Sequence, residues 1–231
     1  MFMKNKIVLV TGSTKGIGKA IAERYESNGY TVIRNGTSNT NYKHYIQADL
    51  STKEGIYKVK DYILTKYKKL DILVNNAAWT KFVEHKDLDS LNENDIDKIL
   101  NLNIKTPFIL VKELFEFFNK ESCIINIASV AGTTSQGSNV VYCASKAALI
   151  SMTKSLARAL GPIRVNSVSP GLTLTGFVTF PGDYIDETVN STPLHKPGYP
   201  EDIAETVYQL TESLTHITGQ DIVVDGGKIL N

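Results

Sequence analysis

Two residues in the second half of the chain have the types and the spacing that suit proton transfer. Tyr142 and Lys146 stand four positions apart, so on a helix their side chains share one face. The unperturbed pKa of a tyrosine is about 10, and it must fall by about 3 for the phenol to exchange protons near neutrality. A nearby cation lowers a phenol pKa, and Lys146 is such a cation. The pair predicts an acid–base catalyst that interconverts a carbonyl and an alcohol. The alternative is a Tyr–Lys pair on a solvated helix face.

A glycine-rich stretch near the N-terminus has the spacing of a phosphate-binding turn. Residues 11–18 contain Gly-x-x-x-Gly-x-Gly, they follow the apolar residues 7–10, and an amphipathic run begins at Ile17. This pattern predicts strand, turn and helix. Glycines let the backbone approach a phosphate closely, and the free N–H groups of a helix N-terminus attract it. The alternative is an ordinary Gly-rich turn of an α/β protein.

Two further polar residues, Ser129 and Asn103, stand at positions where they can hydrogen-bond a substrate or a water. Ser129 follows an apolar run and precedes the loop to Tyr142, where its hydroxyl can bond a substrate oxygen, although serine is also a common turn residue. Asn103 lies inside a predicted helix, and Pro107 follows four residues later. Proline has no N–H, so the carbonyl of Asn103 loses its helical donor and the helix is expected to kink. A carbonyl freed in this way can hold a water, and a kink without any further role is the alternative.

Strands alternate with helices along the whole chain, which predicts parallel strands, right-handed crossovers and helices on both faces of one sheet. The apolar runs predict strands at residues 6–10, 31–35, 43–48, 71–75, 122–128, 163–169 and 220–224. Periodicity and capping signals predict helices at 17–28, from the capping box 51–54 to Tyr67, from the capping box 90–93 to Phe118, at 142–160 and at 201–212. The predicted fold class is therefore α/β: a single-domain, Rossmann-type, doubly wound parallel sheet of about seven strands that spans residues 1–231.

Composition limits the class of partners. The 231 residues carry 25 Lys and Arg against 24 Asp and Glu, and a net charge of +1 gives no reason to expect nucleic acid or a membrane surface as partner. Cys123 and Cys143 are too few for a disulfide framework and indicate a reducing compartment. The histidines have no metal-ligand spacing, so we expect no metal site. No transmembrane run or signal peptide is recognised, and a cytoplasmic protein is expected.

Several short motifs occur in an order typical of one enzyme family. They are Thr11-Gly12-x-x-x-Gly16-x-Gly18, Asp49, Asn75-Asn76-Ala77-Ala78, Asn103, Ser129, Tyr142-x-x-x-Lys146, Pro170-Gly171 and Val224-Asp225-Gly226-Gly227. On these motifs the chain resembles the short-chain dehydrogenase/reductase family over nearly its whole length, and most of all its 3-oxoacyl-acyl-carrier-protein reductases. Sugar, steroid and secondary-metabolite ketoreductases share the motifs. One departure is Ala78, where the family usually has glycine.

The resemblance implies a catalytic set. Tyr142 matches the family's proton donor, and Lys146 matches its cationic partner, which also bonds the nicotinamide ribose. Ser129 matches the residue that orients the substrate, and Asn103 matches the residue that anchors a relay water.

The resemblance also implies a dinucleotide site, and we expect the cofactor to be NADP(H). An NAD-preferring site has a carboxylate at the end of the second strand, and residues 34–38 contain no acid. Lys15 stands in the glycine turn, where the family's NADP users carry a base. Arg34 is a second candidate cation, although side chains alternate along a strand and Arg34 can point to the other face. In order along the chain, the residues expected at the cofactor are Gly12, Ser13, Thr14, Lys15, Gly16, Ile17, Gly18, Arg34, Thr37, Asp49, Leu50, Asn76, Ala77, Tyr142, Lys146, Pro170, Gly171 and Thr173.

The predicted function is an NADP-dependent ketoreductase that transfers a hydride between NADPH and a carbonyl or secondary alcohol, with a 3-oxoacyl thioester as one candidate substrate. The alternatives are an NAD(P)-dependent alcohol or sugar dehydrogenase of the same family, a non-catalytic dinucleotide-binding module, and an epimerase or dehydratase of nucleotide sugars. Residues 172–200 are expected to cover the substrate, with Trp79 and Phe82 opposite. Lys120 is one candidate docking residue for a carrier protein, and no second residue matches.

The long helix after residue 93 carries apolar side chains nearly around its circumference. A helix that is apolar on several sides is usually buried on several sides. In the resembling family this helix and the Tyr-bearing helix pack against a symmetry mate, so we expect a homo-oligomer, and specifically a homotetramer. The apolar residues in question are Phe108, Leu114, Phe115, Phe117 and Phe118.

Overall fold

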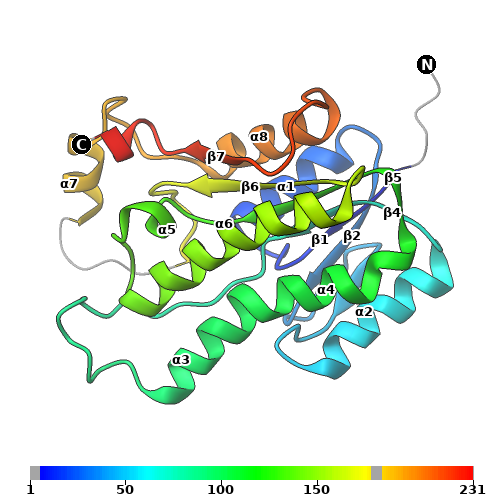
Figure 1. Cartoon of the computed structure of the whole chain (residues 1–231), viewed down its shortest axis with the longest axis horizontal. Coiled ribbons are helices and arrows are strands. Elements are labelled where there is room, and N and C mark those ends of the chain that lie inside the picture. The colour runs from blue at the N-terminus through cyan, green and yellow to red at the C-terminus, as the bar shows by residue number, and fades with distance from the viewer. Residues whose placement is uncertain (1–5, 178–183, 231) are drawn as a thin grey trace.

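The strands form one parallel sheet, as the sequence predicts. The computed structural model describes residues 6–177 and 184–230, and within them the sheet has seven strands in the order β3-β2-β1-β4-β5-β6-β7 (Figure 1). All neighbouring pairs are parallel. The chain runs from β1 outward to β2 and β3 and returns at β4, so the carboxyl ends of β1 and β4 flank the point where doubly wound sheets bind ligands. The strands are β1 (Ile7–Val10), β2 (Thr31–Gly36), β3 (Tyr45–Gln47), β4 (Leu70–Asn75), β5 (Phe118–Ile127), β6 (Arg164–Pro170) and β7 (Asp221–Val224).

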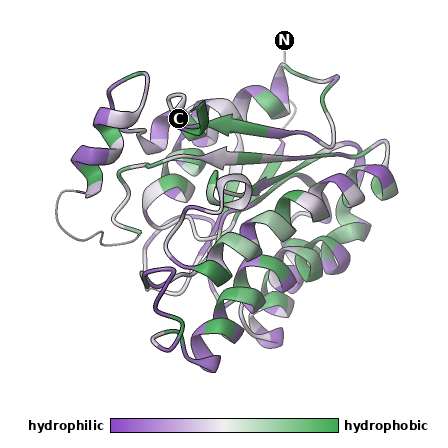
Figure 2. Cartoon of the chain, turned by 60° about the vertical axis from the view of Figure 1, so that its left-hand side comes forward, coloured by the Kyte–Doolittle hydropathy of each residue, from purple (hydrophilic) through white to green (hydrophobic). Residues whose placement is uncertain are grey.

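Helices cover both faces of this sheet. One face packs against α1 (Gly16–Glu26) and α8 (Pro200–Glu212), and the other against α2 (Lys53–Lys66), α4 (Thr106–Leu114) and α6 (Val140–Leu160). In Figure 2 the helices carry both apolar and hydrophilic residues, as amphipathic helices with one buried side do. No helix in the described ranges is long and apolar enough to cross a bilayer. The other helical elements are α3 (Glu93–Leu100), a π-helical turn (Asn101–Lys105), α5 (Ala131–Thr134), α7 (Tyr184–Ser191) and two 3-10 turns (Phe115–Phe117 and Lys228–Leu230).

The alternation of side chains along the strands divides the core into two layers. Leu9 and Ile33 lie in the layer under α2, α4 and α6, whereas Val8 and Val32 lie in the layer under α1 and α8. The same alternation carries Arg34, the residue after Ile33, to the α1 side of the sheet. This direction decides what Arg34 can contact.

The predicted long helix after residue 93 is confirmed as far as Leu114 and is wrong at its end. It runs without a gap through α3, the π-helical turn at Asn101–Lys105 and α4. The irregularity expected four residues before Pro107 is present as this π-helical turn, which contains Asn103. The helix then stops at Leu114, because Phe117 turns into the core, where it is 5% exposed, and Phe118 begins β5.

Both predicted capping boxes are shifted. The N-cap of α2 is Thr52, whose side chain accepts a hydrogen bond from the Gly55 N–H, while the Ser51 hydroxyl donates to Asp49. The N-cap of α3 is Asn92, whose side chain accepts from the Asp95 N–H. In each case a neighbouring residue with an equally suitable side chain takes the capping position.

Two helices were not expected. They are α5, just after Ser129, and α7, which lies within the predicted substrate-covering segment 172–200. Residues 178–183 of that segment, like residues 1–5 and 231, lie outside the described residues.

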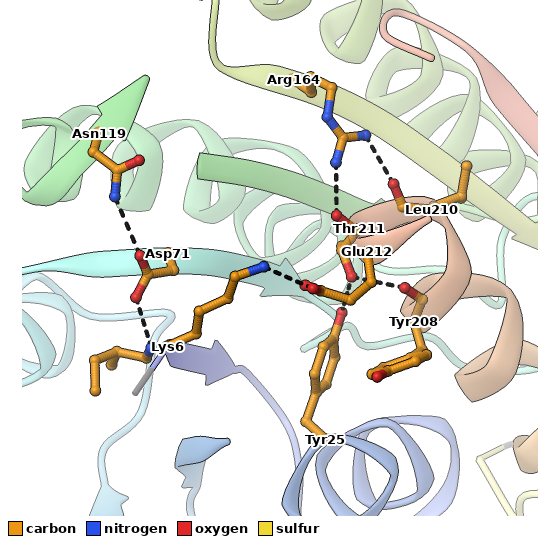
Figure 3. A network of polar contacts seen from close by, with 10 residues as sticks. Lys6, Tyr25, Asp71, Asn119, Arg164, Tyr208, Leu210, Thr211 and Glu212 are labelled. Carbon is orange, nitrogen blue, oxygen red and sulfur yellow. Dashed lines mark hydrogen bonds and ion pairs between the residues drawn. The ribbon is translucent and has the colours of Figure 1, made fainter. Parts of the chain in front are cut away.

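Polar contacts near the amino ends of the strands join α8 to the rest of the fold (Figure 3). Arg164, at the start of β6, donates to the carbonyls of Leu210 and Thr211, each at 2.8 Å. Glu212 accepts a hydrogen bond from Lys6 Nζ at 2.7 Å, and the Tyr25 hydroxyl lies 2.7 Å from Thr211 Oγ1. The Arg164 guanidinium therefore satisfies the last carbonyls of α8 and interacts favourably with its dipole.

Replacing Arg164 by Met is expected to lower the free energy of unfolding by about 1.5–3 kcal/mol, because charge-assisted hydrogen bonds to carbonyls of the last turn are lost. Urea unfolding at fixed protein concentration measures the change. The matched control is Lys86→Met, which breaks an ion pair whose side chains are 86% and 62% exposed and is expected to cost less than about 1 kcal/mol. Equal effects of the two substitutions would contradict the capping role of Arg164.

Candidate active site

The predicted acid–base pair lies on one helix at the carboxyl edge of the sheet. Tyr142 stands in the first turn of α6, and its N–H donates to the N-cap residue Asn139 at 2.7 Å. Lys146 is one turn further along, with its Nζ 5.7 Å from the centroid of the Tyr142 ring. The Nζ donates to the carbonyl of Ile127, the last residue of β5, at 2.8 Å. The structure therefore brings the cation beside the phenol and ties both to the end of β5.

Ser129 completes this group. It follows β5 by two residues, and its side chain is close enough to Tyr142 to lower the pKa of the phenol. Its Oγ also accepts from the N–H of Ala131, at the start of α5, at 3.2 Å. The hydroxyls of Ser129 and Tyr142 are thus placed so that both can hydrogen-bond the same oxygen atom of a bound molecule.

Burial acts on both titrating groups of the pair. It raises the pKa of Tyr142 to about 12, and the nearby Ser129 side chain lowers that pKa in part. Burial lowers the pKa of Lys146 to about 8. The direction for the tyrosine is the reverse of the fall expected from the sequence, because loss of water disfavours the phenolate. A raised pKa keeps the phenol protonated, which is the form that can donate to a carbonyl oxygen.

Asn103 sits in the π-helical turn and is 1% exposed. Its Oδ1 accepts from the Trp79 N–H at 2.9 Å, and its Nδ2 donates to the Trp79 carbonyl and to Ser145 Oγ, each at 3.1 Å. Ser145 Oγ in turn donates to the Tyr142 carbonyl at 2.7 Å. The side chain of Asn103 therefore links the loop after β4 to the helix that carries the tyrosine.

The glycine turn has the shape that a phosphate requires. Gly12 and Gly16 have φ of 62° and 55°, a region that side chains disfavour. A Cβ on Gly18 would stand 2.4 Å from the Asn76 amide nitrogen, so only glycine fits there. Helix α1 begins at Gly16 without a side-chain cap, which leaves N–H groups of its first turn available for an anion.

Asn76 and Thr11 hold this turn against β4. The Asn76 side chain donates to the carbonyls of Thr11 and Gly12, at 2.9 and 3.1 Å. Thr11 Oγ1 accepts from the N–H groups of Asn76 and Ala77, each at 2.9 Å. Ser13 is fully buried, whereas Lys15 and Thr37 are exposed beside it at the ends of the turn and of β2.

The other predicted cofactor residues border the same edge of the sheet. Asp49 is exposed, with one carboxylate oxygen accepting from the Ser51 N–H and hydroxyl, and Leu50 beside it is buried. At the end of β6, the Gly171 N–H donates to the Val224 carbonyl, and the Thr173 hydroxyl donates to the Gly171 carbonyl. Ile17, Gly16 and Thr14 are partly buried in the turn, and Pro170 ends β6.

Arg34 is the predicted cofactor residue that the structure does not bring to this surface. Its side chain is 1% exposed, and its guanidinium is held by Glu26 of α1 and by the Ser13 carbonyl. The strand alternation noted above points it beneath the glycine turn.

Several residues that build the site were missed by the sequence analysis. Asn139 is the N-cap of α6, and an asparagine directly before an apolar helical run is a signal that could have found it. Trp79, expected only as a pocket wall, is tied through its backbone to Asn103. Glu26 and Tyr42 meet Arg34 from distant positions, and no local signal reveals them. No group of three or more potential metal ligands occurs within residues 6–177 and 184–230.

Comparisons with known proteins agree with this arrangement. The family model described as enoyl-(acyl carrier protein) reductase matches residues 12–228. The chain is 35% identical to the 3-oxoacyl-[acyl-carrier-protein] reductase FabG of Aquifex aeolicus, with 97% of this chain and 98% of that protein covered. It is 33% identical to the NAD-dependent glycerol dehydrogenase of Listeria innocua, with 96% and 93% covered.

Solved structures of three other proteins have a similar fold. A double mutant of Serratia marcescens short-chain dehydrogenase/reductase has a TM-score of 0.88 at 29% identity, with 98% of each chain covered. A blue fluorescent protein from a metagenomic library in complex with NADPH has a TM-score of 0.88 at 28% identity, with 99% of each chain covered. A 4-hydroxyisoleucine dehydrogenase complexed with NADH has a TM-score of 0.87 at 30% identity, with 98% of this chain and 100% of that chain covered.

Proposed function

Because this chain belongs to the short-chain dehydrogenase/reductase family, we propose that it is an NADPH-dependent ketoreductase that interconverts a carbonyl and a secondary alcohol. The observation that carries the proposal is the group formed by Tyr142, Ser129 and Lys146 at the sheet edge that also holds the glycine turn. A 3-oxoacyl thioester is one candidate substrate, supported by the likeness to ketoacyl reductases.

The residues present fit a dinucleotide. Gly12 and Gly16 hold conformations that side chains disfavour, Gly18 has no room for a side chain, and α1 starts without a cap. The nicotinamide supplies or accepts the hydride when it is bound. Tyr142 donates its phenolic proton to the carbonyl oxygen, and Ser129 bonds that oxygen and holds it beside the phenol. Lys146 stabilises the phenolate that remains, and Asn103 keeps the α6 helix in register with the loop after β4.

Replacing Tyr142 by Phe tests this division of roles, because it removes only the hydroxyl. We expect kcat to fall by about 10²–10⁴-fold with NADPH affinity nearly unchanged. Lys146→Ala is expected to reduce both kcat and NADPH affinity, and Asn103→Ala to have a milder effect on kcat. Steady-state kinetics on a ketone that the unaltered chain reduces, together with NADPH titration by fluorescence, provide the measurements. Near-normal turnover by Tyr142→Phe would place the acid elsewhere.

The pH dependence should follow the charge of Lys146. Its lowered pKa of about 8 means that the ammonium is charged below pH 8 and neutral above it. Because that charge stabilises the Tyr142 phenolate, kcat/KM for carbonyl reduction is expected to be level below pH 8 and to fall by about tenfold per pH unit above it. Lys146→Arg, which stays charged, should move the fall to higher pH. A profile that is level to pH 10 would contradict this assignment.

The proposed preference for NADPH over NADH rests on residues at the end of β2 and in the glycine turn. Similar folds are recorded with either cofactor, so likeness alone does not decide. Lys15 is exposed, and among the residues described its side chain makes no hydrogen bond or ion pair. A Cβ on Gly36 would stand 2.7 Å from Thr14 Cγ2 and 3.0 Å from the Tyr45 hydroxyl, which leaves little room there for a carboxylate side chain. Thr37 follows and is exposed.

We expect kcat/KM to be higher with NADPH than with NADH, and Lys15→Met to reduce that ratio by about tenfold, because a charged hydrogen bond to the 2′-phosphate is lost. Lys19→Met is the matched control: Lys19 is also on the exposed side of α1, but its Nζ lies 3.7 Å from Glu23. In Lys19→Met, the ratio of kcat/KM with NADPH to kcat/KM with NADH should stay unchanged. A preference of the unaltered chain for NADH would contradict the assignment of NADPH as cofactor and favour an NAD-dependent alcohol or sugar dehydrogenase.

Self-association into a homotetramer is part of the proposal. Phe108 of α4 is 46% exposed and Phe115 is 51% exposed, which is unusual for side chains of this size unless another surface covers them. Light scattering at micromolar concentration is expected to exceed the 25.5 kDa of one chain severalfold, and a monomer would contradict it. The two free, buried cysteines support a cytoplasmic location.

A further inference from the structure

Arg34 is the largest side chain that the fold buries almost completely, and the proposed mechanism does not use it. Its Nε and Nη2 donate to the two carboxylate oxygens of Glu26, at 2.9 and 2.8 Å. The Tyr42 ring covers the guanidinium, with the Arg34 Cζ 4.3 Å from the ring centroid. A bidentate carboxylate and an aromatic ring together hold a guanidinium in one orientation.

The remaining guanidinium nitrogen contacts the glycine turn. Arg34 Nη1 donates to the carbonyl of Ser13 at 3.0 Å. The neighbouring residue of β2 holds the same residue of the turn, since the Ser13 N–H donates to the Asn35 carbonyl at 2.8 Å and the Asn35 N–H donates to Ser13 Oγ at 3.0 Å. The end of β2 therefore binds Ser13 through three separate groups.

This contact determines where the next N–H of the turn points. In a trans peptide the carbonyl and the following N–H point in opposite directions. When Arg34 draws the Ser13 carbonyl inward, the Thr14 N–H must point outward, away from the sheet. In the described part of the chain, that N–H makes no hydrogen bond with the protein. It is thus free to meet an anion at the turn.

We propose that Arg34, fixed by Glu26 and Tyr42, is a positioning residue that orients the Ser13–Thr14 peptide of the glycine turn toward the pyrophosphate of the dinucleotide. The proposal rests on the proposed function in one respect, namely that this turn binds a dinucleotide. It replaces the direct contact with the 2′-phosphate expected of Arg34 from the sequence.

The two roles differ in what they predict for the two cofactors. NADPH and NADH share the pyrophosphate, and only NADPH has the 2′-phosphate. A positioning residue therefore affects both Kd values by the same factor, whereas a direct phosphate ligand affects NADPH alone. For Arg34→Met we expect both Kd values, measured by fluorescence titration, to rise by about tenfold.

Substituting Glu26 separates the two roles, because they predict opposite changes in NADPH affinity. The Glu26 side chain is 43% exposed, so Glu26→Gln leaves the core intact. If Arg34 were a phosphate ligand, removing its competing carboxylate would free it and strengthen NADPH binding. If Arg34 positions the turn, Glu26→Gln weakens binding of both cofactors in the same direction as Arg34→Met. In the Arg34→Met background, Glu26→Gln should add little, because both substitutions break one unit.

The chain contains a matched control for the chemistry of this group. Arg24 of α1 pairs with Glu205 at 2.6 Å and lies with its Cζ 4.0 Å from the Tyr208 ring centroid, on the α1–α8 face and away from the turn. Arg24→Met and Glu205→Gln remove the same kinds of contact and should leave both cofactor Kd values unchanged. Thermal unfolding without cofactor shows whether the two pairs of variants lose comparable stability. If Arg34→Met does not fold, Glu26→Gln alone decides the sign.

The outcomes separate this proposal from the proposed function. Equal weakening of both cofactors by Arg34→Met and Glu26→Gln, with unchanged Kd values in the controls, supports a positioning role. Selective loss of NADPH binding in Arg34→Met, tighter NADPH binding in Glu26→Gln, or no change in either variant would overturn it while leaving the proposed function intact. Binding of neither cofactor by the unaltered chain would overturn the proposed function and this inference with it.

Discussion

The hydrogen bonds between Thr11 and Asn76 are the interaction on which the site depends. Thr11 Oγ1 accepts two backbone N–H groups from the loop after β4, and the Asn76 side chain returns two hydrogen bonds to the backbone after β1. They join β1 to β4 at the point where the strand order reverses, which is where a doubly wound fold leaves room for a ligand. Gly18 is required by the same contact, because its missing side chain is what lets the Asn76 amide approach.

From this point, the loop after β4 and its hydrogen bonds lead to α6, the helix that carries the proposed acid–base pair. The loop that begins at Asn76 passes to Trp79, whose backbone is held by Asn103, and Asn103 also binds Ser145. Ser145 lies on α6 between the two members of the acid–base pair, so α6 is fixed relative to the glycine turn. A π-helical turn allows Asn103 this reach, because it interrupts the regular spacing of the helix. The relative position of cofactor and phenol is therefore set by buried side-chain amides and hydroxyls.

The fold was largely predictable because local sequence patterns indicate most of its strands and helices. Apolar runs identified all seven strands, and short motifs identified the residues that meet at the carboxyl edge. What could not be predicted depends on tertiary contacts. The run that ends in Phe117 and Phe118 continues the helical pattern, and only the burial of Phe117 in the core shows where the helix stops. Glu26 and Tyr42 hold the Arg34 guanidinium from distant positions in the chain, which no spacing reveals.

The hydrogen-bond partners of two buried cations, Arg34 and Lys146, explain why different roles are proposed for them. Burying a charged group is unfavourable unless hydrogen bonds compensate it. Arg34 has a carboxylate, a carbonyl and an aromatic ring around it, so its charge is fully compensated and little of it is left for a ligand. Among the described residues, the Lys146 ammonium has a single hydrogen-bond acceptor, the Ile127 carbonyl, and its pKa falls to about 8. An ammonium left with unsatisfied donors gains most from a new acceptor, and in the proposed reaction the phenolate formed at Tyr142 is that acceptor. Under this proposal, the incomplete hydrogen bonding of Lys146 directs its charge to the reacting group.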